Sequence, residues 1–576
     1  MKESRKLVMA AAAFGIIMVF AWGAVAAAPK AETAEQKDGM PAGVPLRQSI
    51  LFAKDHPPPT PRLDDLPLRQ SISQYGITWT LDKPAWVGQF VNGDSYVVGP
   101  VNVTAIDPRP LWGDEVKETI NKEAVREASY PGQQARNGSM FNPRCDHKNK
   151  QAYRECAGFD SRIPHERYAP ELFAHLPIAM KPGDSLVSTV SRPNQEISKF
   201  GGQHVDPLRA AAVLTCLAEP QPPDAFRPSY CDTANSKIHL ARNLRRELLL
   251  KLPKARSAPP KIDAYRVASN GDKLPRGPST LFNAPDYVTS FQRPWLDIVE
   301  FGFAAPVENL PHYGQEIVAL VGDASLLLHT DYPAEEKERL LVNFIQVGID
   351  FWGLARAGRS WPCHGGLNSG RKWPIVFAGL MLDDPQMQSP GQGLPNLHFH
   401  EDDQTAMCPY PYRGQAHERG WTGAKAIFTG HSLPRGGGTG KWEDGFGCVD
   451  VYPPSQWPRL KPDHAPASEG YRRANTSNSW VGQALAVRLM HAEKVWDHDA
   501  FFAYVDRWMT EDDTPFVEAI KSAGGMDWTK VKRGEFGRQG HVMQAKFVRE
   551  MWDRYRNNLP PAPGGHTAPP AEETWK

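Results

Sequence analysis

The segment Gly358–Gly447 concentrates the side chains of this chain that could perform chemistry. It holds 17 of the 48 glycines, more than twice the share that an even distribution would give. Imidazole changes charge near neutral pH, so histidine is the most frequent general acid or base in enzymes. A long glycine-rich, histidine-rich stretch between helical segments is uncommon unless it builds a site, and we expect a catalytic or binding site here. Its histidines are His364, His398, His400, His417 and His431.

Two of these histidines offer a metal site as an alternative. His398 and His400 are two residues apart, and on an extended strand such side chains point the same way. A nearby carboxylate could then complete a site for Zn or Ca. Loop histidines that bind water or a neighbouring polar group are far more common, so we predict no metal or other cofactor and hold this pair in reserve. The chain also lacks the Gly-x-Ser-x-Gly, Walker and dinucleotide glycine patterns.

Composition excludes some classes of protein. The 66 Lys and Arg nearly balance the 65 Asp and Glu, and the net charge of +1 provides no basic field for a nucleic-acid backbone. We therefore expect no nucleic-acid partner. With 41% hydrophobic residues the chain is too apolar for a disordered protein. Its 48 glycines and 53 prolines place much of it in loops, which argues against a pure helical bundle.

The N-terminus predicts export. Lys2, Arg5 and Lys6 precede an apolar run over 7–28, and Ala24-Val25-Ala26 is the small-x-small pattern that signal peptidase cleaves. We predict a signal peptide over 1–28 and a secreted or periplasmic protein. An uncleaved anchor is the alternative, because a run of about 20 apolar residues can span a bilayer. No second stretch approaches that length, so we expect no stable membrane insertion after cleavage.

Cysteine spacing suggests two local disulfides, since an oxidising compartment permits them. Cys145 and Cys156 flank a polar, irregular segment, and Cys216 and Cys231 bracket a proline-rich loop. We predict both pairs. The remaining cysteines leave one thiol over, and the sequence does not indicate which one. They are Cys363, Cys408 and Cys448.

The first half of the chain predicts strands. Residues 29–75 read as a proline-rich linker that contains the repeated hexapeptide PLRQSI at 45–50 and 67–72. From Tyr75 apolar residues alternate, and Asn92-Gly93-Asp94 is a hairpin signal between the strand-like runs 87–90 and 96–103. Further strand-like runs lie at 186–190, after the turn 181–184, and at 211–217. We predict a β-sandwich-like domain over 76–260.

The second half predicts helices. Apolar residues form one helical stripe over 317–328 and another over 340–354, which together predict an antiparallel helical hairpin. We expect an α+β multidomain protein whose residues 261–558 form an α/α toroid, followed by a disordered tail over 559–576. Helical periodicity alone also fits an ordinary bundle. The further helices are expected at 372–382, 479–492, 500–509 and 542–556.

Three stretches of the helical part carry a resemblance. They are HYGQEIVALVGDASLLLH, SGRKWPIVFAGLMLDD and NSWVGQALAVRLMHAEKVWDHDAFFAYVDRWM. With the export signal and the β-rich part, they resemble bacterial exported α/α-toroid polysaccharide lyases of the alginate and glucuronan lyase type, over about residues 76–556. The resemblance implies cleavage of a uronic-acid-containing, acidic polysaccharide by β-elimination.

Elimination needs three roles, and the resemblance implies candidates for each. The uronate carboxylate must be neutralised while an enolate forms, for which Asn368 and Arg371 are suited. A base must take the C5 proton and an acid must protonate the leaving oxygen, for which His364, His431 and Tyr313 are candidates. Substrate contacts are expected from Trp361, Lys372, Trp373, Asp402, Trp421, Tyr471 and Arg472.

Two other functions remain open, because a scaffold does not fix its chemistry. A glycoside hydrolase would need two carboxyl groups flanking the scissile bond. A non-catalytic cell-surface glycan-binding protein would use the aromatic residues alone. The carboxylates available for hydrolysis are Glu401, Asp402, Asp403, Glu443 and Asp444.

Overall fold

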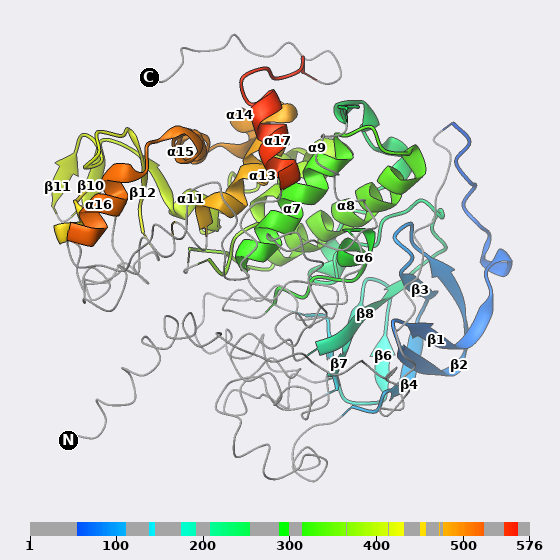
Figure 1. Ribbon diagram of the computed structural model, residues 1–576. Coiled ribbons are helices and arrows are strands. Elements are labelled where there is room, and N and C mark those ends of the chain that lie inside the picture. Colours follow the sequence, from blue (N-terminus) through cyan, green and yellow to red (C-terminus); the bar gives the residue numbers. More distant parts are fainter. Residues whose placement is uncertain are drawn as a thin grey trace, which may run out of the picture.

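The protein is mixed α and β, with a sheet near the N-terminus and helices after it (Figure 1). This order agrees with the predicted succession of a β-rich part and a helical part. The computed structural model describes residues 55–110, 137–143, 174–191, 208–253, 287–298, 314–363, 366–412, 414–430, 450–456, 472, 476–522 and 546–562.

Eight described strands form one sheet that curls into a half-barrel, in the order β5-β7-β8-β3-β2-β4-β6 with β1 beside β2. The pair β3–β8 is parallel and the other pairs are antiparallel. The strands are β1 Leu68–Gln74, β2 Ile77–Gln89, β3 Ser95–Val98, β4 Val101–Asp107, β5 Gly138–Phe141, β6 Ile178–Met180, β7 Ser185–Ser191 and β8 Leu208–Leu217.

The curl explains why the described strands do not form the two packed sheets of the predicted sandwich. The first half of β2 pairs with β4 and its second half pairs with β3, so this 13-residue strand carries the sheet around a bend. The concave interior is filled by apolar side chains such as Trp79, whose indole donates to Ser188 Oγ at 2.9 Å. A single twisted sheet closing on its own apolar face replaces the second sheet.

The predicted turn and the predicted runs 186–190 and 211–217 are confirmed, but the predicted run 96–103 is divided between β3 and β4, and part of the predicted linker forms a strand. Strands β2 and β3 flank the turn Asn92-Gly93-Asp94, where Gly93 has a φ of 94° that favours glycine. Strands β7 and β8 cover the predicted runs 186–190 and 211–217. The second PLRQSI copy, however, lies in β1, so the sheet begins inside the predicted linker 29–75.

The predicted helices are present in the helical part. Lys372–Leu382 forms α9 with the predicted bounds, and the other predicted helices overlap α7, α8, α13, α15 and α17. The α-helices are α6 Tyr287–Gln292, α7 Gly314–Leu328, α8 Ala334–Arg356, α9, α10 Pro385–Gln388, α11 His400–Asp403, α13 Ser477–Leu489, α14 Glu493–Trp496, α15 Asp499–Thr510, α16 Thr514–Ser522 and α17 Lys546–Tyr555. The short 3-10 helices are Leu63–Asp65, Thr233–Asn235, Ala241–Asn243, Arg246–Leu248 and Pro454–Gln456. Four short strands form two antiparallel pairs, β10 with β11 and β9 with β12. They are β9 Thr405–Met407, β10 Tyr410–Tyr412, β11 Gln415–His417 and β12 Ala426–Phe428.

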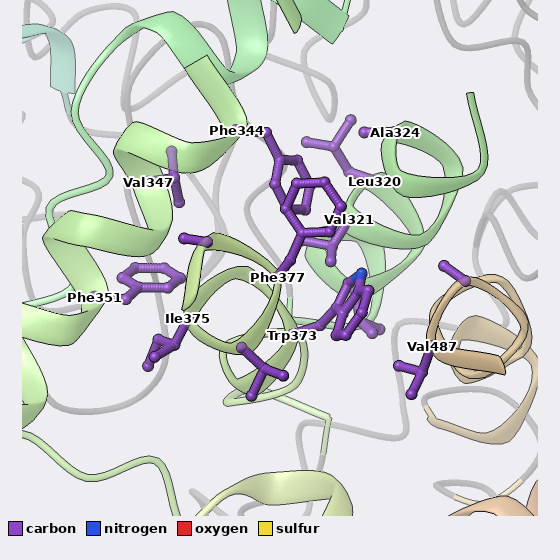
Figure 2. Close-up of a cluster of buried hydrophobic side chains, with 14 of the residues drawn as sticks. Leu320, Val321, Ala324, Phe344, Val347, Phe351, Trp373, Ile375, Phe377 and Val487 are labelled. Carbon is purple, nitrogen blue, oxygen red and sulfur yellow. The ribbon is translucent and has the colours of Figure 1, made fainter. Parts of the chain in front are cut away.

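Aromatic packing joins the helices into one core (Figure 2). Phe377 of α9 lies edge-on to Phe344 of α8, with ring centroids 5.0 Å apart. Trp373 of α9 donates to Ser325 Oγ of α7 at 2.9 Å, so its polar edge is satisfied inside the core. Val487 brings α13 to the same cluster (Figure 2). Thus α7, α8, α9 and α13 share one apolar centre.

The close approach of α7 and α13 depends on glycine. A Cβ at Gly322 would lie 2.7 Å from Gln483 N and 3.0 Å from the Gly482 carbonyl carbon, and backbone cannot move aside as a side chain can. We expect Gly322→Ala to destabilise the protein by about 1–3 kcal/mol through overpacking, measured by urea unfolding. Gly393→Ala is the matched control, because nothing lies within 4 Å of its added Cβ. Equal stability of the two variants would contradict this packing.

The sheet and the helices also share a buried charged contact. Arg227 donates to Asp94 Oδ2 at 2.7 Å and to Asp350 Oδ2 of α8 at 2.6 Å, and all three side chains are buried. Burial raises the pKa of Asp350 to about 6, and the nearby Asp94 carboxylate adds to the rise, although Arg227 acts to lower it. Apolar residues of β7 and β8 belong to the same cluster as the helices. The predicted boundary at residue 260 therefore does not separate two independent cores.

The structure also bears on the predicted C-terminal tail and on the predicted disulfides. The predicted tail from 559 starts in contact with the body, because His491 Nε2 lies 2.8 Å from Pro560 O. The predicted Cys216–Cys231 disulfide is not formed: both thiols are free. Cys216 lies in the sheet interior and Cys231 in the cluster shared with the helices, so the sheet separates them. Cys145, Cys156 and Cys448 lie outside the described residues, as does the predicted signal peptide.

No helix in the described part of the chain combines the length and the apolar character needed to cross a bilayer.

Candidate active site

The short helix α11 holds the most concentrated set of polar contacts in the region that we predicted to build the site. Each of its four consecutive side chains contacts a different neighbour. His400 lies edge-on to Trp480 of α13, and Glu401 accepts from Gly370 N before α9. Asp402 binds the Lys372 ammonium, and Asp403 binds His398. A four-residue helix is not stable alone, so these side-chain contacts hold it in place.

His398 and Asp403 form an imidazole–carboxylate pair. His398 Nδ1 lies 3.1 Å from Asp403 Oδ1, and the His398 side chain is 49% exposed whereas that of Asp403 is 11% exposed. The backbone of His398 is fixed on both sides, since its N–H donates to Ser360 Oγ at 2.7 Å and its carbonyl accepts from Trp361 N at 2.9 Å. One ring nitrogen is thus oriented by a carboxylate while the ring remains open to a ligand.

The pKa shifts and the hydrogen bonds of the His398–Asp403 pair suit proton transfer. The hydrogen bond that His398 donates to the Asp403 carboxylate raises the pKa of His398 above its ordinary value, and burial raises the pKa of Asp403. Asp403 Oδ2 is held as well, because it accepts from Cys363 N at 3.0 Å. A carboxylate that fixes the tautomer and orientation of an exposed imidazole is the arrangement by which enzymes build a general base or acid.

Glu401, two residues before Asp403, is fully buried. Its Oε1 accepts from Gly370 N at 2.7 Å, Gln483 Nε2 at 3.1 Å and Ser369 Oγ at 3.2 Å. No hydrogen bond reaches Oε2. Burial raises the pKa of Glu401, because these partners are uncharged and the neighbouring Asp402 is acidic.

The structure does not bring the His398 and His400 imidazoles of the reserve metal site together, as an extended strand would have done. The chain does not continue as a strand but turns into α11 at His400, so His400 is buried against Trp480 while His398 is exposed. The two imidazoles therefore do not face the same way. Within the described ranges, no group of three or more His, Cys, Asp or Glu side chains is arranged to hold a metal ion.

Arg371 is placed as a structural residue and not as a substrate contact. Its side chain is fully buried, and its Nε donates to Asp297 Oδ2 at 3.0 Å. Trp361 Nε1 donates to the same oxygen at 2.6 Å, and Arg359 Nη2 lies 3.4 Å from Asp297 Oδ1. Burial acts to raise the pKa of Asp297, but the two guanidiniums and these hydrogen bonds together lower it. Arg371 and Trp361 both belong to the interior, and their predicted substrate roles stay predictions.

The neighbouring candidates also make most of their contacts within the protein. Lys372 lies 4.7 Å from the Trp496 ring centroid and pairs with Asp402, whose Oδ1 accepts from Trp496 Nε1 at 2.9 Å. Trp373 is in the core. Asn368 donates to Pro362 O at 2.7 Å, but its Oδ1 has no hydrogen-bond partner although the residue is buried. Asn368, like Glu401, is therefore a buried candidate that keeps an unused polar atom.

The last two described candidates pack around α16. The fully buried Arg472 guanidinium lies 4.1 Å from the Phe516 ring centroid, and its Nε donates to Tyr504 OH at 3.2 Å. The half-buried Trp421 lies edge-on to Phe516 with centroids 4.9 Å apart. The Arg472 side chain does not reach solvent, whereas Trp421 retains an exposed part.

The other predicted site residues lie outside the described part of the chain. They are His364, His431, Tyr313, Tyr471, Glu443 and Asp444.

Two of the described segments that border them bind α11, and a third packs on the loop before α9. Cys363 N binds Asp403, and Thr429 Oγ1 donates to Asp403 O at 2.7 Å. Gly314, the first residue of α7, packs so closely on the loop before α9 that an added Cβ would lie 2.1 Å from Leu367 O. Cys363 and Thr429, each at or next to the end of a described segment, therefore both hold Asp403, the residue that pairs with His398.

Sequence reasoning missed the pairing of His398 with Asp403. Both residues were noted, His398 for a metal and Asp403 for hydrolysis, but not together. Their separation of five residues is uninformative unless α11 is recognised, and a four-residue helix has too few positions to show a period. No protein-family model, curated protein or solved structure matches this chain.

Proposed function

We propose that the protein is an exported polysaccharide lyase that cleaves a uronic-acid-containing polysaccharide by β-elimination. The observation that carries this proposal is the half-exposed His398 imidazole oriented by the buried Asp403 carboxylate. Elimination needs a base for the C5 proton and an acid for the leaving O4, and an oriented imidazole near its neutral point can serve as either. The sequence resemblance supplies the substrate class.

In this mechanism neutral His398 takes the C5 proton through Nε2, because Nδ1 faces Asp403. The imidazolium that forms is stabilised by the Asp403 carboxylate. Asn368 is the proposed partner of the uronate: its side-chain amide has two N–H donors, one of which is given to Pro362 O, and the other can donate to the uronate carboxylate and to the enolate that forms from it. The acid for O4 is assigned to the candidates Tyr313, His364 and His431.

The helical part supports the proposed toroid scaffold in one respect. Helix α13 lies against α7, although more than 140 residues separate them in sequence, as expected when an array of helical hairpins returns on itself. Side chains of α7, α8 and α9 meet in the shared core (Figure 2). The α/α toroid therefore remains our proposal for this part of the chain.

Hydrolysis is less well supported by the described carboxyl groups. Glu401 is fully buried, Asp402 is bound by Lys372 and Trp496, and Asp403 is bound by His398. A glycoside hydrolase needs one carboxyl group to give a proton to the leaving oxygen and another to face the sugar. None of these three presents a free, exposed carboxyl group.

The experiment that tests the proposal is a product assay on a panel of acidic polysaccharides: alginate, glucuronan, hyaluronan, chondroitin, heparan and pectic substrates. Elimination leaves a C4–C5 double bond conjugated with the carboxylate, which absorbs near 235 nm, whereas hydrolysis leaves none. We expect absorbance and reducing ends to rise together on at least one substrate. Reducing ends without absorbance would indicate a hydrolase, and binding without product would indicate a glycan-binding protein.

A further inference from the structure

Helix α11 needs an anchor to keep Asp403 against His398. Asp403 is the last residue of this four-residue helix, so any movement of α11 carries its carboxylate away from the imidazole. Asp402 links α11 to Lys372 at the start of α9, but the Asp402 side chain is partly exposed. Glu401 is the acidic side chain of α11 that is fully buried, and it joins three segments at once.

The bonds of Glu401 are directed at parts that are themselves rigid. Gly370 N belongs to the turn before α9, where a Cβ on Gly370 would lie 2.8 Å from Val318 Cα of α7. Ser369 Oγ accepts from Trp480 Nε1 at 2.8 Å, and Gln483 lies one turn further along α13. Through one oxygen, Glu401 therefore ties α11 to α13 and to the turn before α9.

A carboxyl group is a costly way to make these bonds. All three partners of Oε1 are uncharged donors, and Oε2 has no hydrogen bond. The acidic neighbour on α11 is Asp402, whose charge is matched by Lys372 and not by any partner of Glu401. Burying an unpaired carboxyl group costs free energy unless it is protonated, so such groups gather at functional sites.

We infer that Glu401 is a positioning residue: through Oε1 it holds α11 so that Asp403 stays hydrogen-bonded to His398. It does not touch substrate and acts through the His398–Asp403 pair. The effect on turnover rests on the proposed function. The effect on the imidazole does not, because it can be observed in the protein without substrate.

The experiment measures the pKa of His398 by NMR of protein labelled with 13C at the histidine ring, with His398→Gln to identify the signal. If Glu401 positions Asp403, Glu401→Ala weakens the 3.1 Å contact and the pKa of His398 falls toward its ordinary value. Glu401→Asp, one methylene shorter, should lower it as well and is the variant to use if the alanine protein fails to fold. Glu401→Gln keeps the accepting oxygen and should preserve the pKa.

The matched control is Ser325→Ala, which removes the buried hydrogen bond that Trp373 makes to α7 but touches nothing on α11. It should lower thermal stability and leave the pKa of His398 unchanged. With a substrate, we expect kcat of Glu401→Ala and Glu401→Asp to fall about tenfold to a hundredfold with KM nearly constant, as for a misplaced catalytic group. An unchanged His398 pKa in both variants overturns the inference. A shifted pKa in a protein that gives no 235 nm product leaves the positioning role standing and rejects the lyase.

Discussion

Replacing Arg371 by methionine is expected to destabilise the protein by about 3–5 kcal/mol. The change removes the guanidinium that lies 3.0 Å from the fully buried Asp297 carboxylate and leaves it only Arg359, at 3.4 Å, as a cationic partner. A buried charge that loses its nearer partner is expensive. Methionine retains much of the apolar volume, so the loss reports the ion pair more than a cavity. Urea unfolding followed by circular dichroism measures the difference in the free energy of unfolding.

The matched control is Arg549→Met in α17, where the arginine forms an exposed ion pair with Asp553 at 3.4 Å. We expect a change of no more than about 0.5 kcal/mol there. An Arg371→Met protein of normal stability that had lost activity would contradict the structural role and restore Arg371 as a substrate contact.

The second large effect is expected at Asp403. Asp403→Asn should lower kcat/KM by about two to four orders of magnitude, because the imidazole loses the carboxylate that orients it and stabilises its charged form. The hydrogen bond to Asp403 raises the pKa of His398, so removing the carboxylate lowers that pKa. A base acts in its neutral form, which exists above its pKa. The acidic limb of the kcat/KM profile should therefore move to lower pH.

A pH–rate profile of the wild type and Asp403→Asn between about pH 4 and 9 checks both the size and the direction. Asp553→Asn on the exposed side of α17 is the control and should reproduce the wild-type profile. A limb that moves to higher pH would mean that Asp403 does not raise the pKa of His398.

Local sequence patterns predicted the elements of this fold better than their assembly. The helix Lys372–Leu382 was predicted with its observed bounds, because an arginine and a glycine precede a continuous apolar run and two aspartates follow it. The Asn92-Gly93-Asp94 turn carries its own chemical signal. Strand β1 was not predicted, because its burial pattern is mostly exposed and its pairing with β2 determines it.

The candidate site depends more strongly on contacts between distant parts of the chain. The sequence marks Arg371 as a cation in a glycine-rich loop, but its partner Asp297 is 74 residues away and no local pattern indicates it. The opposite orientations of His398 and His400 follow from the start of α11, which four residues cannot reveal as a period. The sequence pointed to the region that holds the His398–Asp403 pair but not to the pair itself. The tertiary contacts decide which of their side chains are buried as structural groups and which reach solvent.

The most direct test of the central claim, that His398 is the proton-transferring group of a lyase, is the time course of absorbance near 235 nm for the wild type and His398→Gln on the most reactive substrate of the panel. The account predicts a steady rise with the wild type and a rate lower by about two to four orders of magnitude with His398→Gln, at unchanged thermal stability. An undiminished rise in His398→Gln, or new reducing ends without any absorbance in the wild type, would contradict it.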